Sequence, residues 1–136
     1  MKFNDLTITF HTDKIRDCVD FYSKYFKTAV AFDAEWYVMI RLESDKPMVL
    51  NFQQRNKDLD YSTCSQFGGG VTLNLLVEDV DARYNELDAT DIVFAEKITD
   101  HEWGDRAFSL YDPIGNLIYI YSERPLHEKF KSAVKE

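Results

Sequence analysis

The chain has 136 residues, enough for one compact domain with a buried core. Apolar residues make up 45% and charged residues 29%, which is the balance of a globular protein and excludes a disordered one. The formal net charge is −8, and because nucleic acids are bound by clustered Lys and Arg, this charge argues against a nucleic-acid partner. The sequence has neither the apolar stretch of a signal peptide nor a membrane span, so we expect a cytoplasmic protein with no membrane partner.

The first half of the sequence predicts a strand, a helix and two further strands. Residues 6–12 are β-branched and aromatic, as in a strand. Residues 13–26 have an apolar face at three- and four-residue steps, which predicts a helix with Asp13 as its N-cap. Residues 36–43 and 47–54 are predicted strands joined by a tight polar turn. The helical face consists of Ile15, Cys18, Val19, Tyr22 and Tyr25.

The second half repeats this pattern after a polar segment that ends in three glycines and is predicted to be a linker. A helix is predicted over 78–90, with Asp79 as its cap. In the tail, Leu126, Phe130 and Val134 lie four residues apart, which predicts a short terminal helix. The predicted strands of this half are 71–77, 92–100, 106–112 and 116–123.

The apolar patterns of the two halves match at an offset of 65 residues. This internal repeat predicts an α+β fold of two tandem βαβββ modules, each with one helix-covered face, that together form a cup-shaped mixed sheet. We place module one at about 4–56, the linker at about 57–69, module two at about 70–123 and the tail at 124–136. The matched helical residues are Ile15 with Val80, Val19 with Tyr84, and Tyr22 with Leu87.

Neither cysteine indicates a disulfide framework or a zinc site. Cys18 and Cys64 are far apart, and there is no Cys-x-x-Cys motif. Cys18 falls on the apolar face of the first predicted helix and is expected to pack there as a small hydrophobic residue.

Three stretches, in this order, resemble the vicinal oxygen chelate superfamily, which contains glyoxalase I, the extradiol dioxygenases and the bleomycin resistance proteins. "ITFHTDKIRDCVDFYSKYF" is similar to the family's first strand and helix, and "LNLLVEDVDARYNEL" to the strand and helix start of its second module. "EWGDRAFSLYDPIGNLIYIYSE" is similar to its C-terminal hairpin, with the Asp-Pro-x-Gly-Asn turn. The resemblance implies the fold but not one activity, because this scaffold hosts several.

The resemblance also implies four metal-ligand positions, and this chain has weak donors at all of them. One position lies on the first strand of each module, at Thr7 in module one and Thr72 in module two. A third follows the Asp-Pro-x-Gly-Asn turn, where Tyr119 replaces the usual Glu. Neutral hydroxyls are poor ligands for divalent cations. We therefore expect no metal and no other cofactor. The fourth position falls on the strand over 47–54, in a register that the sequence leaves open; its candidates are Asn51, Gln53 and Gln54.

Strand alternation predicts which side chains line the cup, and these are hydroxyl-rich and aromatic. Trp36, Tyr37 and Trp103 begin strands or hairpins at the rim, where they either stack on a ligand or pack at an edge or dimer interface. Arg106 either clamps a ligand carboxylate or forms a salt bridge within its hairpin. The predicted ligand-binding residues are Thr7, Thr9, His11, Trp36, Tyr37, Thr72, Asn74, Trp103, Arg106, Tyr119 and Tyr121.

Catalytic groups are few. His11 in the cup is either a general base or a structural histidine. His101 is placed in a loop and His127 in the tail, and no nucleophile with a neighbouring histidine stands out, so we predict no catalytic residue.

The resulting hypothesis is a metal-free small-molecule binding protein of the bleomycin-resistance type, which sequesters a cationic or aromatic ligand as a homodimer and serves antibiotic resistance. One alternative is a glyoxalase-like lyase or isomerase, or a dioxygenase-type enzyme, with a non-standard metal site. Another is a non-catalytic interaction or regulatory protein whose cup holds a metabolite or packs against its own partner chain.

Overall fold

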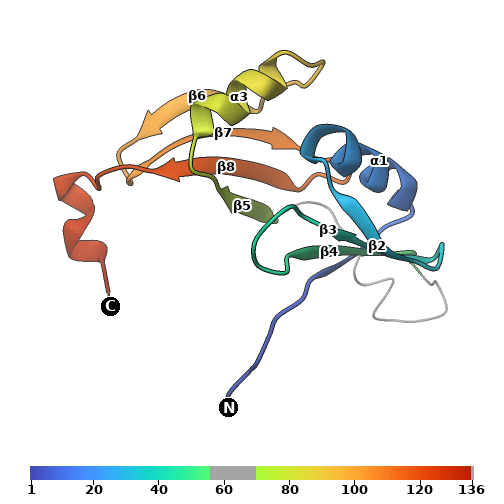
Figure 1. Ribbon diagram of the computed structural model, residues 1–136. Coiled ribbons are helices and arrows are strands. Elements are labelled where there is room, and N and C mark those ends of the chain that lie inside the picture. The colour runs from blue at the N-terminus through green and yellow to red at the C-terminus, as the bar shows by residue number, and fades with distance from the viewer. Residues whose placement is uncertain (56–69, 136) are drawn as a thin grey trace. The chain divides into compact units, whose positions relative to one another are not determined.

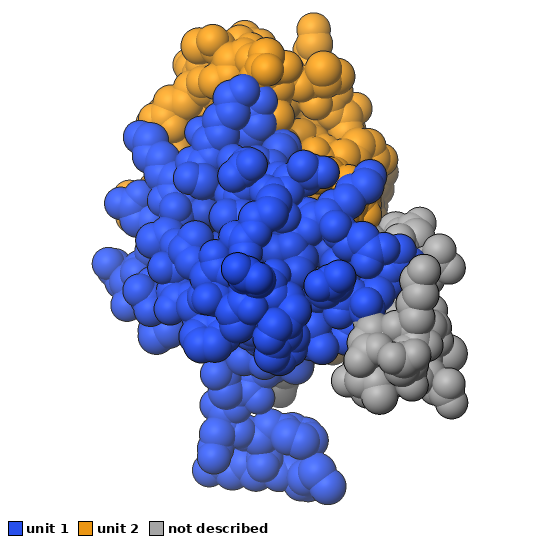
Figure 2. Space-filling view, turned by 90° about the vertical axis from the view of Figure 1, so that its right-hand side faces the viewer, with its two compact units in different colours: residues 1–69 blue, residues 70–136 orange. Residues whose placement is uncertain are grey.

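The computed structural model describes residues 1–55 and 70–135. The predicted linker at about 57–69, and Cys64 within it, lie outside the described residues. The chain divides into two compact units, residues 1–69 (unit 1) and 70–136 (unit 2), coloured separately in Figure 2. Each unit is described by itself below.

Unit 1 is a four-stranded mixed sheet with one helix (Figure 1). The strand order is β1-β4-β3-β2, in which β1 pairs with β4 in parallel and the other pairs are antiparallel. The predicted apolar face of the helix is confirmed, since Ile15, Cys18, Val19 and Tyr22 are all buried. The elements are β1 (Thr9–His11), α1 (Ile15–Phe26), β2 (Ala29–Asp33), β3 (Tyr37–Arg41) and β4 (Val49–Gln53).

Unit 2 repeats the same topology with the strand order β5-β8-β7-β6. Its parallel pair is β5 with β8, and its helix α3 packs against β7 and β8. The predicted cap is confirmed, because the carboxylate of Asp79 accepts a hydrogen bond from the backbone N–H of Ala82 at 3.0 Å. The elements are β5 (Thr72–Leu76), α3 (Val80–Asp88), β6 (Glu96–His101), β7 (Asp105–Tyr111) and β8 (Leu117–Glu123).

The fold is therefore α+β, built from two tandem βαβββ modules, as the sequence predicts. The predicted terminal helix is present as a short 3-10 helix, η1 (Glu128–Ala133), which follows β8 (Figure 1). No helix among the described residues has the length and apolar character needed to span a bilayer.

The core of each unit lies between its helix and one face of its sheet. In unit 1, Phe52 of β4 is fully buried, with its ring centroid 5.9 Å from that of Tyr22 on α1. In unit 2, Phe108 of β7 is fully buried and meets Tyr84 of α3 edge-on at 5.2 Å. Such aromatic pairs stabilise a core beyond the area they bury.

Unit 1 departs from the sequence prediction at three points. The strand predicted over 6–12 is shorter, and Thr7 lies before β1 on an exposed segment. The sequence pattern does not predict β2, because every residue of this edge strand is exposed and it has no alternation of buried and exposed positions. Asp13 does not cap α1; its carboxylate pairs with Arg55, while the Thr12 hydroxyl accepts from the backbone N–H of Lys14 at 3.0 Å.

Candidate functional site

The candidate site lies on the face of the unit 2 sheet that points away from α3. Along β8, Ile118 and Ile120 are buried, whereas Tyr119 and Tyr121 are half-buried and point to the opposite face. In the ladder Tyr119 pairs with Asn74 of β5, and Ser109 of β7 flanks it on the other side. We call this face the tyrosine face; on β5, β7 and β8 it includes Thr72, Asn74, Ala107, Ser109, Tyr119 and Tyr121.

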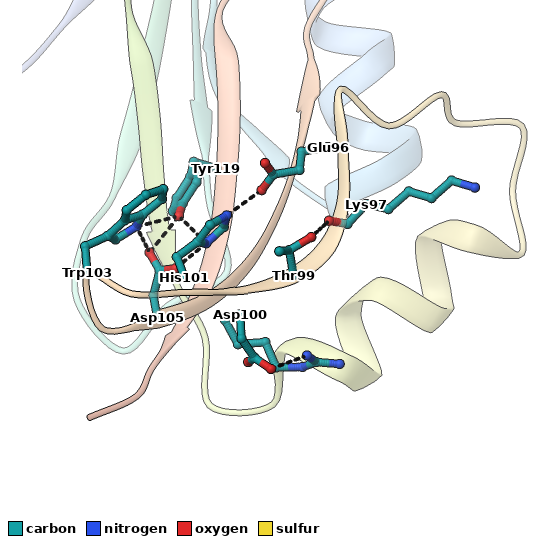
Figure 3. Close-up of polar contacts among 9 residues, drawn as sticks. Glu96, Lys97, Thr99, Asp100, His101, Trp103, Asp105 and Tyr119 are labelled. Carbon is teal, nitrogen blue, oxygen red and sulfur yellow. Dashed lines mark hydrogen bonds and ion pairs between the residues drawn. The ribbon is translucent and has the colours of Figure 1, made fainter. Parts of the chain in front are cut away.

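Five side chains at one end of this face form a connected polar and aromatic group, which we call the His101 cluster (Figure 3). It draws on the ends of β6 and β7, the turn between them, and the middle of β8. Two members, Trp103 and Tyr119, were predicted site residues, and the structure brings them together through a hydrogen bond of 3.2 Å. The members are Glu96, His101, Trp103, Asp105 and Tyr119.

Asp105 is the hub of the cluster. One carboxylate oxygen lies 2.7 Å from Nδ1 of His101, and the other accepts the Tyr119 hydroxyl at 2.6 Å and the indole N–H of Trp103 at 3.1 Å. The Asp105 side chain is only 10% exposed. A buried carboxylate is costly unless charged or polar partners surround it, and here three side chains do so.

His101 lies between two carboxylates. Its Nδ1 meets Asp105 and its Nε2 meets Glu96, each at 2.7 Å. Burial favours the neutral ring and lowers its pKa, but the hydrogen bonds to Asp105 and Glu96 outweigh burial, so the pKa of His101 is raised above its ordinary value. A neutral imidazole donates from one nitrogen only, so two carboxylate acceptors select the imidazolium. The structure also corrects the predicted loop, because His101 is the last residue of β6.

Tyr119 remains a neutral phenol at physiological pH. Burial and the carboxylate of Asp105 raise the pKa of Tyr119 to about 12. Its hydroxyl donates to Asp105 and also receives the indole N–H of Trp103. The hydroxyl is therefore engaged with other side chains of the cluster at the position where the resemblance implies a metal-ligating glutamate.

Gly104 sets the turn that presents Trp103. Its φ of +100° lies in the region that glycine adopts without strain. A Cβ at this position would lie 3.1 Å from the carbonyl oxygen of Arg124, so the close approach of two backbone segments also requires glycine. The turn leaves the Trp103 side chain 57% exposed, while its ring stacks on His101 with centroids 4.3 Å apart.

The structure does not bring Arg106 into this group. Its guanidinium binds Asp81 of α3 at 3.0 Å and Asp100 of β6 at 3.1 Å. In Figure 3 Asp100 lies on the α3 side of the sheet, away from Tyr119. The ion pairs favour the salt-bridge interpretation of Arg106 over the ligand clamp, although the pairing includes the helix as well as the hairpin.

The remaining predicted site residues belong to unit 1. Thr9 and His11 lie on β1, and Thr9 pairs with Asn51 of β4 in the ladder. Tyr37 begins β3 and its ring lies 5.9 Å from that of Trp36, which is 56% exposed. These residues belong to unit 1, whereas the His101 cluster belongs to unit 2.

The ladders also fix the register that the sequence leaves open. Thr9 corresponds to Asn74 at the repeat offset, and Asn51 pairs with Thr9 as Tyr119 pairs with Asn74. Asn51 is thus the unit 1 counterpart of Tyr119. Its side-chain oxygen is buried with no hydrogen-bond partner among the described residues.

The four positions do not fit a family-type divalent metal. Thr7 and Thr72 are exposed threonines, Tyr119 is a neutral phenol tied to Asp105, and Asn51 contributes at most one amide oxygen. Divalent transition-metal ions are held mainly by imidazole, carboxylate or thiolate groups, and none occurs at these positions. The His101 cluster does not substitute for them, because Glu96 and Asp105 bind opposite nitrogens of the ring and therefore diverge.

Sequence reasoning missed Glu96, His101 and Asp105 as site residues. The signal was present but weak: His101 and Asp105 flank the Glu-Trp-Gly turn and pair directly in the β6–β7 ladder. The strand predicted over 92–100 ends one residue before His101, which places the histidine in a loop. A strand placed over Glu96–His101 would have put Glu96 and His101 beside β7.

The fold and these positions define the class of protein. Residues 6–123 match the family described as glyoxalase-like domain. The chain belongs to this family. No curated protein sequence matches it significantly.

Solved structures agree with the fold at low sequence identity. A glyoxalase/bleomycin resistance protein/dioxygenase from Nocardioides aligns with a TM-score of 0.75 and 15% identity, covering 91% of this chain and 86% of that one. A member of the same superfamily from Sphaerobacter thermophilus gives 0.67 and 19%, with coverages of 86% and 94%. TioX from Micromonospora sp. ML1 gives 0.68 and 13%, with coverages of 89% and 99%. At such identities the likeness shows the fold alone.

Proposed function

We propose that this protein is a metal-free small-molecule binding protein of the bleomycin-resistance type, which sequesters an organic ligand with aromatic or cationic character. One observation carries the proposal. At the position of the implied metal-ligating glutamate stands Tyr119, whose hydroxyl is bound by Asp105 and Trp103. A group engaged in this way is not available to a metal, whereas the aromatic rings beside it are suited to stacking.

The charge of the His101 cluster supports a cationic ligand. Two carboxylates, Glu96 and Asp105, flank one imidazole, His101, so the cluster is negatively charged whether or not the ring is protonated. The whole chain carries −8. Cations are attracted to the faces of Trp and Tyr rings, and a negative surrounding adds to that attraction.

Calorimetric titration with three probes tests the proposal. Proflavine is a planar aromatic cation, tetraethylammonium a cation without a ring, and 1-naphthoate an aromatic anion. We expect proflavine to bind more tightly than either of the others. The proposal fails if no probe with an aromatic ring binds the wild-type protein.

A pair of variants ties binding to the candidate site. Trp103→Ala removes the exposed ring and is expected to weaken proflavine binding by about 5- to 150-fold, since stacking contributes about 1–3 kcal/mol per ring. Phe32→Ala is the matched control, because Phe32 is similarly exposed, 53% against 57%, but lies on β2 of unit 1. Equal weakening by both substitutions would count against the assignment of the site to Trp103.

The proposal includes assembly as a homodimer, by resemblance to that class. Sedimentation equilibrium of the purified protein is expected to give twice the mass of the chain. A monomer at concentrations where proflavine binds would remove the dimer from the proposal without affecting the binding site.

A further inference from the structure

Trp103 is fixed in place although more than half of its side chain is exposed. Its indole N–H is shared between Asp105 Oδ2 at 3.1 Å and the Tyr119 hydroxyl at 3.2 Å. One face of the ring lies on His101 at an interplanar angle of 9°. An exposed tryptophan normally samples several rotamers, so a ring bound at its edge and on one face has lost that freedom.

The ring of His101, in turn, is held at both ends. Nδ1 is bonded to Asp105 on β7 and Nε2 to Glu96 on β6. Bonds at opposite nitrogens prevent the imidazole from rotating out of its plane. The imidazole of His101 therefore provides a flat, fixed surface on which the indole stacks, and its own side chain is only 8% exposed.

We infer that His101 is a positioning residue, which holds the indole of Trp103 as a preformed stacking surface through ring contact and through the two carboxylates that orient it. The inference rests on the proposed function in taking Trp103 as a ligand contact, and His101 itself touches no ligand. A surface that is already ordered binds more tightly, because the ligand does not have to order it.

The positioning depends on a proton. With both nitrogens protonated, His101 donates to both carboxylates and offers a cation to the indole face. With one proton removed, one carboxylate faces a nitrogen lone pair and the stacking loses its charge. The groups facing the ring are Glu96 from β6, Asp105 from β7, Tyr119 from β8 and Trp103 from the turn. Burial lowers the pKa of His101, but the hydrogen bonds to Asp105 and Glu96 outweigh burial and raise it.

Two other charged side chains near the turn, Arg106 and Glu102, are paired elsewhere. Arg106 is bound to Asp81 and Asp100 on the α3 side of the sheet. Glu102 forms an ion pair with Lys129 of η1. The proton on His101 is therefore controlled chiefly by Glu96 and Asp105.

The test uses the fluorescence of Trp103, which a stacked imidazolium quenches. The chain has two tryptophans, so Trp36→Phe leaves Trp103 as the single emitter. In this background we expect the emission to rise in one step as the pH increases, with a midpoint above the ordinary histidine value of about 6.5. The step should be absent in His101→Gln and present in His127→Gln, the control for removing a histidine outside the cluster.

Glu96→Gln provides an independent variant that is expected to remain folded, since the Glu96 side chain is 48% exposed on an edge strand. Removing this carboxylate should move the step to lower pH without abolishing it. A purely structural role for His101 predicts no such shift. His101→Phe keeps a stacked ring without a proton and should also lack the step, so loss of folding in one His101 variant does not decide the result.

Absence of a step in the parent, or a step that persists in His101→Gln and His101→Phe, would overturn the inference. The proflavine titration separates it from the proposed function. A normal step with no proflavine binding would mean that His101 positions Trp103 but the proposed function is wrong. Proflavine binding by the parent with no step would support the proposed function and overturn the inference that His101 positions Trp103.

Discussion

At the scale of single residues, Gly104 is the residue on which the presentation of Trp103 depends. Gly104→Ala places a Cβ 3.1 Å from the carbonyl oxygen of Arg124 on a backbone with φ of +100°. We expect a loss of about 1–3 kcal/mol in the free energy of unfolding, measured by urea denaturation, because the backbone is strained and a neighbouring segment must move. In the Trp36→Phe background, the pH step of Trp103 emission should also weaken.

Gly115→Ala is the matched control for this substitution. Its φ of +86° is also positive, but nothing lies within 4 Å of the added Cβ. It should incur only the backbone cost, about 1–2 kcal/mol, and leave Trp103 emission unchanged. If the two variants lose equal stability and Trp103 responds to neither, then Gly104 is not required by its close approach to Arg124.

His101 also predicts how stability depends on pH. Its pKa is raised in the folded state: burial lowers it, and the bonds to Asp105 and Glu96 more than offset that effect. The stabilisation is therefore fully present below the unfolded-state pKa of about 6.5 and is lost as the pH rises through the folded-state pKa. Urea denaturation at a series of pH values should show the free energy of unfolding falling across that window. In His101→Gln this fall should be absent, and an unchanged profile would contradict the assignment of the charge to His101.

At the scale of elements, the two helices begin in different ways. Asp79 caps α3 through the N–H of Ala82. The N-cap of α1 is Lys14, which makes no side-chain cap hydrogen bond, and the carboxylate of Asp13 pairs with Arg55. We expect Asp79→Ala to lower the free energy of unfolding by about 1 kcal/mol, measured by denaturant titration. Asp13→Ala, which removes an exposed ion pair, should cost less. A larger loss in Asp13→Ala would mean that the first helix uses the cap that its sequence suggests.

The sequence predicts most elements because burial in them follows a period. The face of α1 and the alternation of β8 both contain large apolar residues at the expected steps, and both are confirmed. The edge strand β2 could not be found in this way, since all five of its residues are exposed and its existence depends on pairing with β3. Periodicity reports on packing, and it carries no information about a strand held mainly by backbone hydrogen bonds.

The candidate site was predicted only in part, for a related reason. Tyr119 and Trp103 were found because a turn motif and exposed aromatic character mark them. Glu96, His101 and Asp105 are brought together by the register of β6 on β7, which includes an irregularity between Glu96 and Thr99. A shift of one residue in a strand exchanges its two faces, and the sequence does not specify where such an irregularity falls.

At the scale of the whole molecule, the two modules share one topology but differ at equivalent positions. Tyr119 in unit 2 and Asn51 in unit 1 occupy the same rung of their ladders. The first is tied into a side-chain cluster, and the second has a buried amide oxygen with no partner among the described residues. The two modules thus share a backbone topology, while the side chains at the implied metal positions are phenol, amide and hydroxyl groups.

These groups lead to a prediction for the protein as a whole. Thermal unfolding with Zn²⁺, Ni²⁺, Mn²⁺ or Fe²⁺ should match that of a chelator-treated sample, because weak donors occupy all four implied positions. A ligand specific for the native state at a hundredfold excess over its Kd adds about 2.7 kcal/mol to the free energy of unfolding, which is a readily measured increase in Tm. Proflavine, at such an excess, should produce that increase and serves as the positive control. A comparable increase with one metal would instead favour an enzyme with a non-standard metal site, and Tyr119→Phe and Asn51→Ala would then show whether the implied positions contribute to it.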